Sequence, residues 1–210
     1  MQLFTSLWGA FARRGGLCRA AQLLAAALLA GCWLPASGAA QVDVDAARNG
    51  DLVEVRALAT IDAPLALVWS TLTDYERLPE FIPGLKKSRV IARVGATATV
   101  EQSGEARFLF LAVPIDVTVE STERPPNIEV RRVAGTLRHL QGRYETELLG
   151  NPARVQLRWI GSIAPDSDLP ALIGEALIRL LIEQQFVAMV REIERREAAR
   201  RQGTPVPAAK

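Results

Sequence analysis

The sequence predicts an α+β domain in which a curved, seven-stranded antiparallel sheet carries two short helices after its first strand and one long helix at its C-terminal end. Two observations predict this class. Between residues 51 and 163, apolar residues recur at every second position over most of the chain, which is the periodicity of half-buried strands. From residue 168 to about residue 200, they recur every three or four positions, which is the periodicity of an amphipathic helix.

Residues 1–40 have the composition of a secretory signal peptide. Three arginines and no acidic residue accompany an apolar run, Ala20–Leu34, which is short for a membrane span. Cleavage after Ala39 or Ala40 would suit a signal peptidase, because small residues surround that point. The tetrapeptide ending at Cys32 reads Leu-Ala-Gly-Cys and is similar to a bacterial lipobox, in which the cysteine is lipidated. Both interpretations stay open, and both predict export to the bacterial periplasm, the second with a membrane anchor.

Charge and cysteine content exclude several classes of function for the exported part. Without the three leader arginines, the 25 basic residues become 22, against 23 acidic ones, so binding to nucleic acid is not indicated. Both cysteines, Cys18 and Cys32, belong to the leader. We therefore expect no disulfide, no cysteine nucleophile and no thiolate metal site in the domain at residues 51–200.

The strands are expected to form a meander. The first covers residues 53–61, after a polar linker at residues 41–50. Alternation of period two predicts six more, with a bulge near Gly104. Short turns join them, which implies sequential antiparallel pairing. These six strands cover residues 88–93, 97–111, 113–123, 128–133, 138–149 and 154–163.

The stretch Pro64–Leu85 reads as two short helices. Pro64 suits the first helical position, whose N–H has no partner within a helix. Pro79 and Pro83 break the helical pattern before it can become one long helix. We expect the break between the two helices at Thr73–Asp74.

The long final helix is expected to begin at Asp168, a good N-cap residue followed closely by Pro170. It ends near Arg200, and residues 201–210 read as a disordered tail. Its apolar stripe is wider than a single seam. The residues at the edges of the stripe either belong to the core, which we favour, or are partly exposed beside a cavity entrance and touch a membrane. The residues that widen the stripe are Ile178, Leu181, Ile182 and Met189.

The order of elements is that of the helix-grip arrangement, in which a long helix crosses the concave face of a curved sheet. Such a sheet leaves space between itself and the helix. Here the inward strand residues are apolar, so the space is expected to bind a hydrophobic small molecule. The candidate ligand-binding residues are Trp69, Tyr75, Phe81, Phe108, Phe110, Val117, Arg138, Leu140, Tyr144, Trp159, Ile173, Leu177 and Leu180.

Several of these side chains have a second interpretation. The aromatic ones are more often plain core. Arg138 could meet a polar group of the ligand, but an ion pair at the sheet rim is favoured. Asp74 and Glu76 could act as an acid–base pair, but capping of the second helix by Asp74 is favoured. His139, the single histidine, is expected to face outward as a solvated side chain, without a metal or a catalytic partner.

Two stretches carry a resemblance to a known family. They are Val68–Ile91 (VWSTLTDYERLPEFIPGLKKSRVI) and Gly135–Tyr144 (GTLRHLQGRY). The chain resembles the START-like (SRPBCC) superfamily over about residues 52–198, in particular the polyketide cyclase/dehydrase group and its coenzyme Q-binding Coq10 type. The second stretch is similar to the pattern Gly-x-Phe-Arg-x-Leu-x-Gly-x-Trp, with Leu137 and Tyr144 at the aromatic positions. These two departures keep the hydrophobic character of the positions but change the shape of a cavity. The family's ligand is therefore not assigned to this chain by the resemblance.

The resemblance implies a START-like helix-grip fold and a hydrophobic ligand such as a lipid, a quinone or a polyketide-like molecule. We expect a monomeric carrier without cofactor, metal or catalytic residues. The alternative is a cyclase/dehydrase-type enzyme, and a third reading is an interaction protein like the ribosome-association toxins of this fold, which export would contradict. The prolines and Gly84 make Pro64–Leu85 a lid-like element at the cavity entrance.

Overall fold

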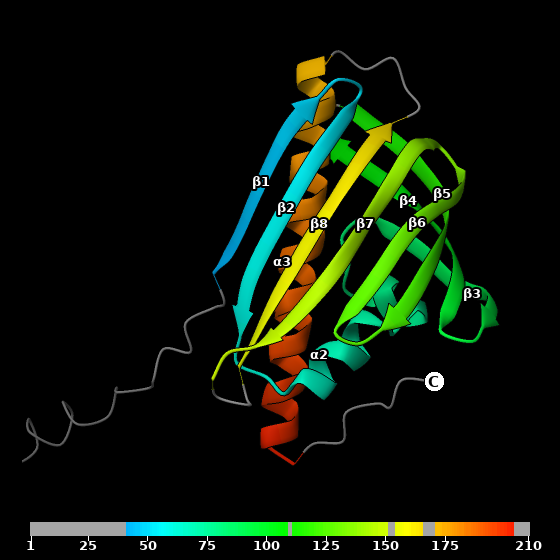
Figure 1. Cartoon of the computed structure of the whole chain (residues 1–210). Coiled ribbons are helices and arrows are strands. Elements are labelled where there is room, and N and C mark those ends of the chain that lie inside the picture. The colour runs from blue at the N-terminus through cyan, green and yellow to red at the C-terminus, as the bar shows by residue number, and fades with distance from the viewer. Residues whose placement is uncertain (1–40, 109–110, 151–153, 166–170, 204–210) are drawn as a thin grey trace, which may run out of the picture. The chain divides into compact units, whose positions relative to one another are not determined.

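The computed structural model describes residues 41–203 except 109–110, 151–153 and 166–170 (Figure 1). Of residues 108, 111, 165 and 171–173 it describes the backbone alone. Within this part of the chain, one antiparallel sheet of eight strands is crossed by a long helix. The predicted α+β, helix-grip architecture is therefore confirmed, with one strand more than expected.

The strands pair in the order β1-β2-β8-β7-β6-β5-β4-β3. The six strands after the helical pair form the predicted meander, and the pairing of β2 with β8 joins its last strand to the start of the domain. The strands are β1 (Val42–Asn49), β2 (Leu52–Ile61), β3 (Leu85–Val94), β4 (Thr97–Phe108), β5 (Leu111–Arg124), β6 (Asn127–Gly135), β7 (Leu137–Leu148) and β8 (Val155–Pro165).

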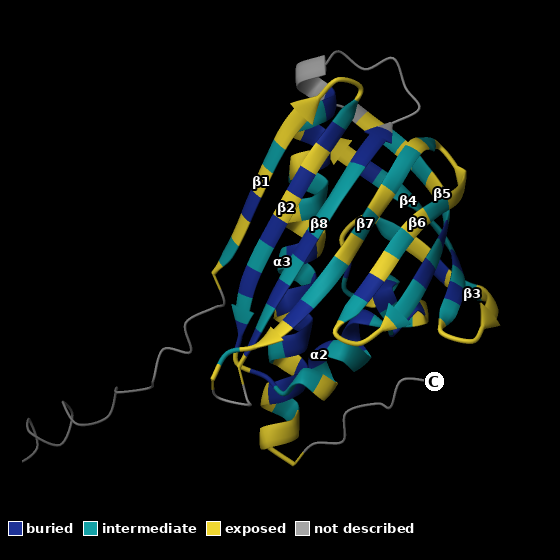
Figure 2. Cartoon of the chain, viewed as in Figure 1, coloured by how far each residue is buried: buried dark blue, intermediate teal, exposed yellow. Residues whose placement is uncertain are grey.

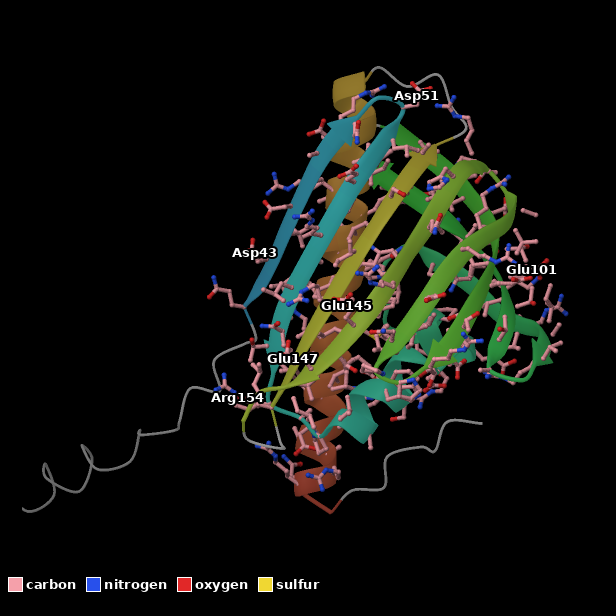
Figure 3. The ribbon with its side chains drawn as sticks, viewed as in Figure 1. Asp43, Asp51, Glu101, Glu145, Glu147 and Arg154 are labelled. Carbon is pink, nitrogen blue, oxygen red and sulfur yellow. The ribbon has the colours of Figure 1, made fainter. Side chains whose placement is uncertain are left out.

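Strand β1 occupies most of the segment that the sequence indicated as a linker, so that prediction was wrong. It pairs with β2 without interruption, from Val42 opposite Ala59 to Asn49 opposite Leu52. Val44 is buried, whereas Asp43 points away from the sheet (Figure 3). The alternation of apolar and polar residues is present in β1 but weak, because aspartate is rare in strands and alanine has little hydrophobic surface.

The helices are α2 (Leu65–Leu72), the 3-10 helix η1 (Tyr75–Glu80) and α3 (Ala171–Arg201). The break between α2 and η1 lies at Thr73–Asp74, as predicted. Pro64 is the N-cap of α2 rather than its first residue, with an extended ψ of 143°. Pro79 lies inside η1, where it supplies no backbone N–H, in keeping with a short and tight helix.

The core lies between the inner face of the sheet and α3, which runs along the sheet in Figure 1. On β2 every second residue is buried, and Figure 2 shows this as alternating bands. Burying each large aliphatic side chain contributes roughly 1.5–3 kcal/mol. The sheet and α3 supply most of this core, among them Val53, Val55, Ile61, Val155, Leu157, Phe186, Met189, Val190 and Ile193.

A strand irregularity lies near Gly104, as predicted, but in the strand opposite. The pairing of Gly104 with Ile115 of β5 is part of a regular ladder, but the register toward β3 shifts between Leu85, the partner of Gly104, and Lys87, so the irregularity predicted near Gly104 lies in the partner strand. A Cβ atom at Gly104 would overlap the carbonyl oxygen of Gly84, so the glycine permits two backbones to approach closely. Among the described residues, no helix is long and apolar enough to cross a membrane.

Candidate functional site

A cavity of about 150 Å³ lies between α3 and the sheet. Strands β4, β5, β7 and β8 form its floor, α3 forms its roof, and the loop that leads into β3 forms part of its rim. Its lining residues are Pro83, Gly84, Leu85, Gln102, Ser103, Gly104, Glu105, Ile115, Val117, Leu137, Leu140, Ile163, Ile178, Leu181, Ile182 and Gln185. Nine of these sixteen residues have aliphatic side chains, so the walls favour an apolar ligand.

The polar lining residues lie on β4 and at one position of α3. Gln102 donates a hydrogen bond to Ser88 Oγ at 3.3 Å. The Glu105 carboxylate accepts a hydrogen bond from Arg107 Nε at 2.5 Å and lies 3.5 Å from Lys86 Nζ. The hydrogen bond from Arg107 holds the pKa of Glu105 below its ordinary value. Glu105 is therefore a paired anion at neutral pH.

A second, inner chamber of about 90 Å³ adjoins the cavity. Leu140, Ile182 and Gln185 line both spaces, so the two share a wall. The other lining residues of the inner chamber are Tyr144, Trp159 and Phe186. This chamber therefore has aromatic walls where the outer cavity has aliphatic ones.

Two glycines hold the Trp159 indole in place. Gly142 on β7 pairs directly with Gly161 on β8. A Cβ atom at Gly142 would lie 2.6 Å from two indole carbons, and one at Gly161 would lie 2.8 Å from one of them. The indole thus rests over both glycine backbones, beside the Tyr144 ring, whose centroid is 4.6 Å away at a tilt of 50°.

Two polar groups of the inner chamber have no hydrogen-bond partner among the described residues. Trp159 is about 5% exposed, and its buried Nε1–H has no acceptor. The hydroxyl of Tyr144 forms no hydrogen bond in this part of the chain either, and burial raises its pKa to about 12. At neutral pH the phenol of Tyr144 therefore keeps its proton. The Trp159 Nε1–H has almost no accessible surface, so it does not open into the chamber.

The rim loop is fastened to β4. The backbone N–H of Glu105 donates to the carbonyl oxygen of Gly84 at 2.9 Å. Gly84 has a φ of +78°, and a Cβ atom there would lie 2.5 Å from the carbonyl oxygen of Glu105. Only glycine fits this position without displacing the loop.

The structure brings four of the sequence-predicted site residues to the two spaces: Val117, Leu140, Tyr144 and Trp159. The aromatic residues of the helical pair belong elsewhere. Trp69 and Phe81 pack against the core. The buried hydroxyl of Tyr75 is 2.7 Å from Ser121 Oγ and 3.1 Å from Glu123 Oε1, and burial raises its pKa. These three side chains line neither space.

The remaining predicted residues divide into two groups. Arg138 is exposed, Leu177 is buried and Leu180 is half-buried, and none of the three lines either space. Phe110 and the side chains of Phe108 and Ile173 lie outside the described part of the structure. His139 is half-buried rather than fully solvated, and its Nε2 is 2.9 Å from Ser162 Oγ.

Several lining residues were missed. The wide apolar stripe of α3 was the signal for Ile178, Leu181 and Ile182, which line the cavity. Ile178 also belongs to the core, as was favoured, and Ile182 packs against that core. Ile163 follows Trp159 on the same face of β8. Leu137 carries no such signal, because a register shift between Leu137 and His139 brings it to the cavity together with Leu140. Other missed residues are Ile115, Gln185 and Phe186.

A wider hollow of about 590 Å³ lies over the outer face of the sheet. It is bordered by side chains of both charges, including the ion pair between Arg131 and Glu120. This surface is solvated and carries charges of both signs, so it does not enclose an apolar ligand. Among the described residues, no group of three or more His, Cys, Asp or Glu side chains is arranged to hold a metal ion.

A family model described as polyketide cyclase/dehydrase and lipid transport matches residues 61–190, which is more than half of the chain. The chain belongs to this family. The predicted START-like membership is thereby confirmed, whereas the coenzyme Q-binding type stays a prediction. A search of curated protein sequences found no match.

Solved structures of the START superfamily share the fold of this family member. The Zhui aromatase/cyclase from Streptomyces sp. R1128 is 16% identical, with 73% of this chain and 99% of that one covered and a TM-score of 0.61. A START superfamily protein from Mycobacterium smegmatis is 16% identical to this chain and has a TM-score of 0.56; the match covers 68% of this chain and 97% of that one. A STAR-related lipid transfer protein from Xanthomonas axonopodis is 11% identical to this chain and has a TM-score of 0.58; the match covers 75% of this chain and 94% of that one. At these identities the likeness extends to the fold alone.

Proposed function

We propose that this protein binds and carries a hydrophobic small molecule, a lipid or a quinone-like compound, without changing it chemically. The observation that carries the proposal is the pair of adjoining apolar spaces between α3 and the sheet. Ligand sites of this kind are mostly apolar and have a few polar groups that fix orientation. The described lining fits that pattern.

The titratable groups of the described lining argue against catalysis. They are Glu105, held as an anion by Arg107, and Tyr144, whose pKa is raised to about 12 by burial. A general acid or base works best when its pKa lies near the operating pH. Neither group meets that condition at neutral pH.

The size of the spaces points to an elongated ligand. Sites for drug-sized molecules usually measure about 300–1,000 Å³. The cavity and the inner chamber, at about 150 and 90 Å³, are smaller. A chain-like molecule can occupy both in sequence and leave its remainder at the exposed rim near Pro83 and Gln185.

A cyclase/dehydrase reaction on a polyketide-like substrate is the second candidate function. The family description names that activity beside lipid transport, and the Zhui protein is an aromatase/cyclase. The protonated hydroxyl of Tyr144, which lines the inner chamber, could polarise a substrate carbonyl. Conversion of a bound polyketide-like substrate by the purified protein, slowed by Tyr144→Phe, would favour this candidate over the carrier.

We further propose that the protein acts in the bacterial periplasm, as the leader predicts. Strand β1 begins at Val42, so cleavage after Ala39 or Ala40 is compatible with an intact sheet. Lipidation of Cys32 would instead leave about ten residues between the membrane and β1, enough to keep the domain near a lipid surface. The intact mass of the N-terminal peptide distinguishes the two forms.

The experiment that tests the carrier proposal is extraction of the protein purified from the periplasmic or membrane fraction, followed by mass spectrometry of the extract. We expect one class of hydrophobic molecule to copurify in near-stoichiometric amount. Delipidated protein should take up the same class again. Failure of the delipidated protein to bind any quinone, fatty acid or phospholipid would contradict the proposal.

A further inference from the structure

Strand β3 forms one free edge of the sheet, opposite the edge formed by β1 (Figure 1). Its sequence, LKKSRVIARV, contains four basic residues and no acidic one. The other edge strand, β1, contains two aspartates and one arginine. The two free edges therefore differ in charge, although residues 41–210 are nearly neutral as a whole.

Neighbouring carboxylates neutralise only part of the positive charge at the β3 edge. Two glutamates of β4 each lie within ion-pair distance of two cations, so each group keeps one positive charge in excess. All four cationic side chains are more than half exposed, so a negatively charged surface can reach them. The contacts are Lys87 and Arg89 with Glu101 at 3.2 and 3.1 Å, and Lys86 and Arg107 with Glu105 at 3.5 and 2.5 Å.

The cations of β3 flank the sheet edge on both sides. Ser88 is buried, so Lys87 and Arg89, its neighbours along the strand, point to the outer face. Arg93 pairs with the buried Ala98 and therefore points to the inner face. A register shift in the middle of β3 separates the two groups. This arrangement suits a broad surface that meets the edge, rather than a small ligand on one face.

Apolar side chains are exposed among these cations. Ile91 is 48% exposed and Val94 is 79% exposed, and both belong to β3. Cations on an edge strand also prevent pairing with other strands, but that role does not account for an exposed valine and isoleucine beside them. Basic and apolar side chains together are typical of segments that lie in the headgroup region of an anionic bilayer.

We infer that the β3 edge is a docking surface for an anionic lipid bilayer, with Lys87 and Arg89 at the lipid phosphates and Val94 between the headgroups. The cavity rim at Pro83 and Gly84 directly precedes this strand, so docking brings the rim close to the lipid. The inference goes beyond the proposed carrier function, because docking requires no bound ligand.

The test is co-sedimentation of the mature protein with vesicles of phosphatidylcholine alone and of phosphatidylcholine mixed with phosphatidylglycerol. The informative quantity is the ratio of the partition coefficients for anionic and neutral vesicles, because a lipid anchor at Cys32 would contribute equally to both. We expect this ratio to exceed one and to fall as salt is added, since salt screens exposed charges.

Lys87→Gln combined with Arg89→Gln should lower the ratio by roughly tenfold. Arg48→Gln combined with Arg56→Gln is the matched control, because it removes the same charge from β1 and β2 at the opposite side of the sheet. It should leave the ratio nearly unchanged. All four side chains are exposed, so both double variants are expected to fold.

A second measurement identifies the face that touches the lipid. In Val94→Cys the new thiol is the single free one in either predicted mature form, because Cys18 is removed with the leader and Cys32 is removed or lipidated. An environment-sensitive fluorophore on this thiol should shift its emission to the blue on anionic vesicles. The same label in Leu148→Cys is the control, since Leu148 is 51% exposed but lies at the end of β7. It should not shift.

Every other outcome overturns the docking inference. Equal binding to neutral and anionic vesicles would remove the requirement for an anionic surface. Equal ratios in the two double variants would show that the β3 cations do not act in docking, and a shift at Leu148 without one at Val94 would assign docking to another face. The carrier function is read separately, from uptake of the copurifying molecule by delipidated protein without vesicles, and its failure would leave the docking result standing.

Discussion

Arg196 Nη2 donates a hydrogen bond to Asp74 Oδ2 at 2.9 Å, and both side chains are almost completely buried. The contact joins α3 to the break between α2 and η1, across 122 residues of sequence. Arg196 Nε also donates to Glu192 at 2.7 Å, and its guanidinium lies 5.8 Å from the centre of the Phe81 ring. The helical pair is thus fastened to the long helix by one buried cation.

This contact changes the predicted role of Asp74. The residue occupies the N-cap position of η1, as the sequence indicated, but its side chain makes no capping hydrogen bond. Its carboxylate instead faces Arg196, with Arg77 Nη1 3.6 Å away. The acid–base pairing of Asp74 with Glu76 has no support, because Glu76 is exposed and Asp74 is committed to the ion pair.

Substitution of Arg196 by methionine should lower the free energy of unfolding by about 3–5 kcal/mol, because two buried carboxylates then lose their shared cation. Arg195→Met is the matched control. Arg195 also binds Glu192, but its side chain is 61% exposed, so we expect a loss below about 1 kcal/mol. Urea unfolding of the two variants measures both values, and equal losses would contradict the proposed role of the buried contact.

Glu192 should contribute to acid sensitivity. Burial by itself would raise the pKa of Glu192, but hydrogen bonds from Arg195 and Arg196 outweigh it and hold the pKa below its ordinary value of 4.5. A lowered pKa in the folded state means that the contribution is complete above pH 4.5 and is lost as the pH falls through the folded pKa. Below pH 4.5, Glu192→Gln should therefore lose stability with a shallower slope than the unchanged protein.

Unfolding by urea at a series of pH values between 6 and about 3 measures this slope. Glu147→Gln serves as the control, because Glu147 is exposed and makes no ion pair with other described residues. It should keep the slope of the unchanged protein. A parallel curve for Glu192→Gln would show that the hydrogen bonds of Glu192 contribute nothing to stability in acid.

The sheet and its meander could be predicted because period-two alternation is decided by local sequence. The inner face of β8, from Val155 to Ile163, follows that rule and is correct. The rule failed at β1, where aspartate and alanine weaken the contrast between the two faces. Helix periodicity likewise identified the residues of α3 that share a face, without distinguishing those that meet solid core from those that meet the cavity.

The cavity itself depends on contacts between distant parts of the chain. Nothing local to Gly142 or Gly161 indicates that they pair across two strands and accommodate Trp159. In the same way, the sequence of the charged last turns of α3 does not indicate that Arg196 is buried. Its burial depends on its partner Asp74, which lies between α2 and η1, 122 residues away in the sequence. Pairing register and burial of this kind are set by the whole fold.

Gly142→Ala should disturb the inner chamber, because the new methyl group would lie 2.6 Å from the Trp159 indole and must displace it. Overpacking of this kind costs about 1–3 kcal/mol of stability. We also expect weaker binding of the hydrophobic molecule that copurifies with the protein and a change in the Trp159 fluorescence. Thermal unfolding, ligand-binding measurements and tryptophan fluorescence measure the three effects.

Gly174→Ala is a suitable control for Gly142→Ala. Gly174 belongs to α3, and a Cβ atom there would have no atom within 4 Å. Alanine has a higher helix propensity than glycine, so this variant should gain up to about 1 kcal/mol. A similar gain in Gly142→Ala would contradict the placement of the indole over the two glycines.

Gly84→Ala tests whether the rim loop is held against β4 and controls access to the cavity. The change adds a methyl group 2.5 Å from the Glu105 carbonyl oxygen at a φ of +78°, so the loop must move away from β4. We expect a loss of about 1–3 kcal/mol in the free energy of unfolding, faster hydrogen exchange at residues 83–85 and an altered affinity for the hydrophobic molecule that copurifies with the protein. Gly95→Ala is the control. Gly95 also has a positive φ, of +57°, but a Cβ atom there would have no atom within 4 Å, so this variant has the backbone strain of alanine without a steric overlap. Equal losses in the two variants, together with unchanged exchange and affinity in Gly84→Ala, would mean that the rim has no part in ligand entry.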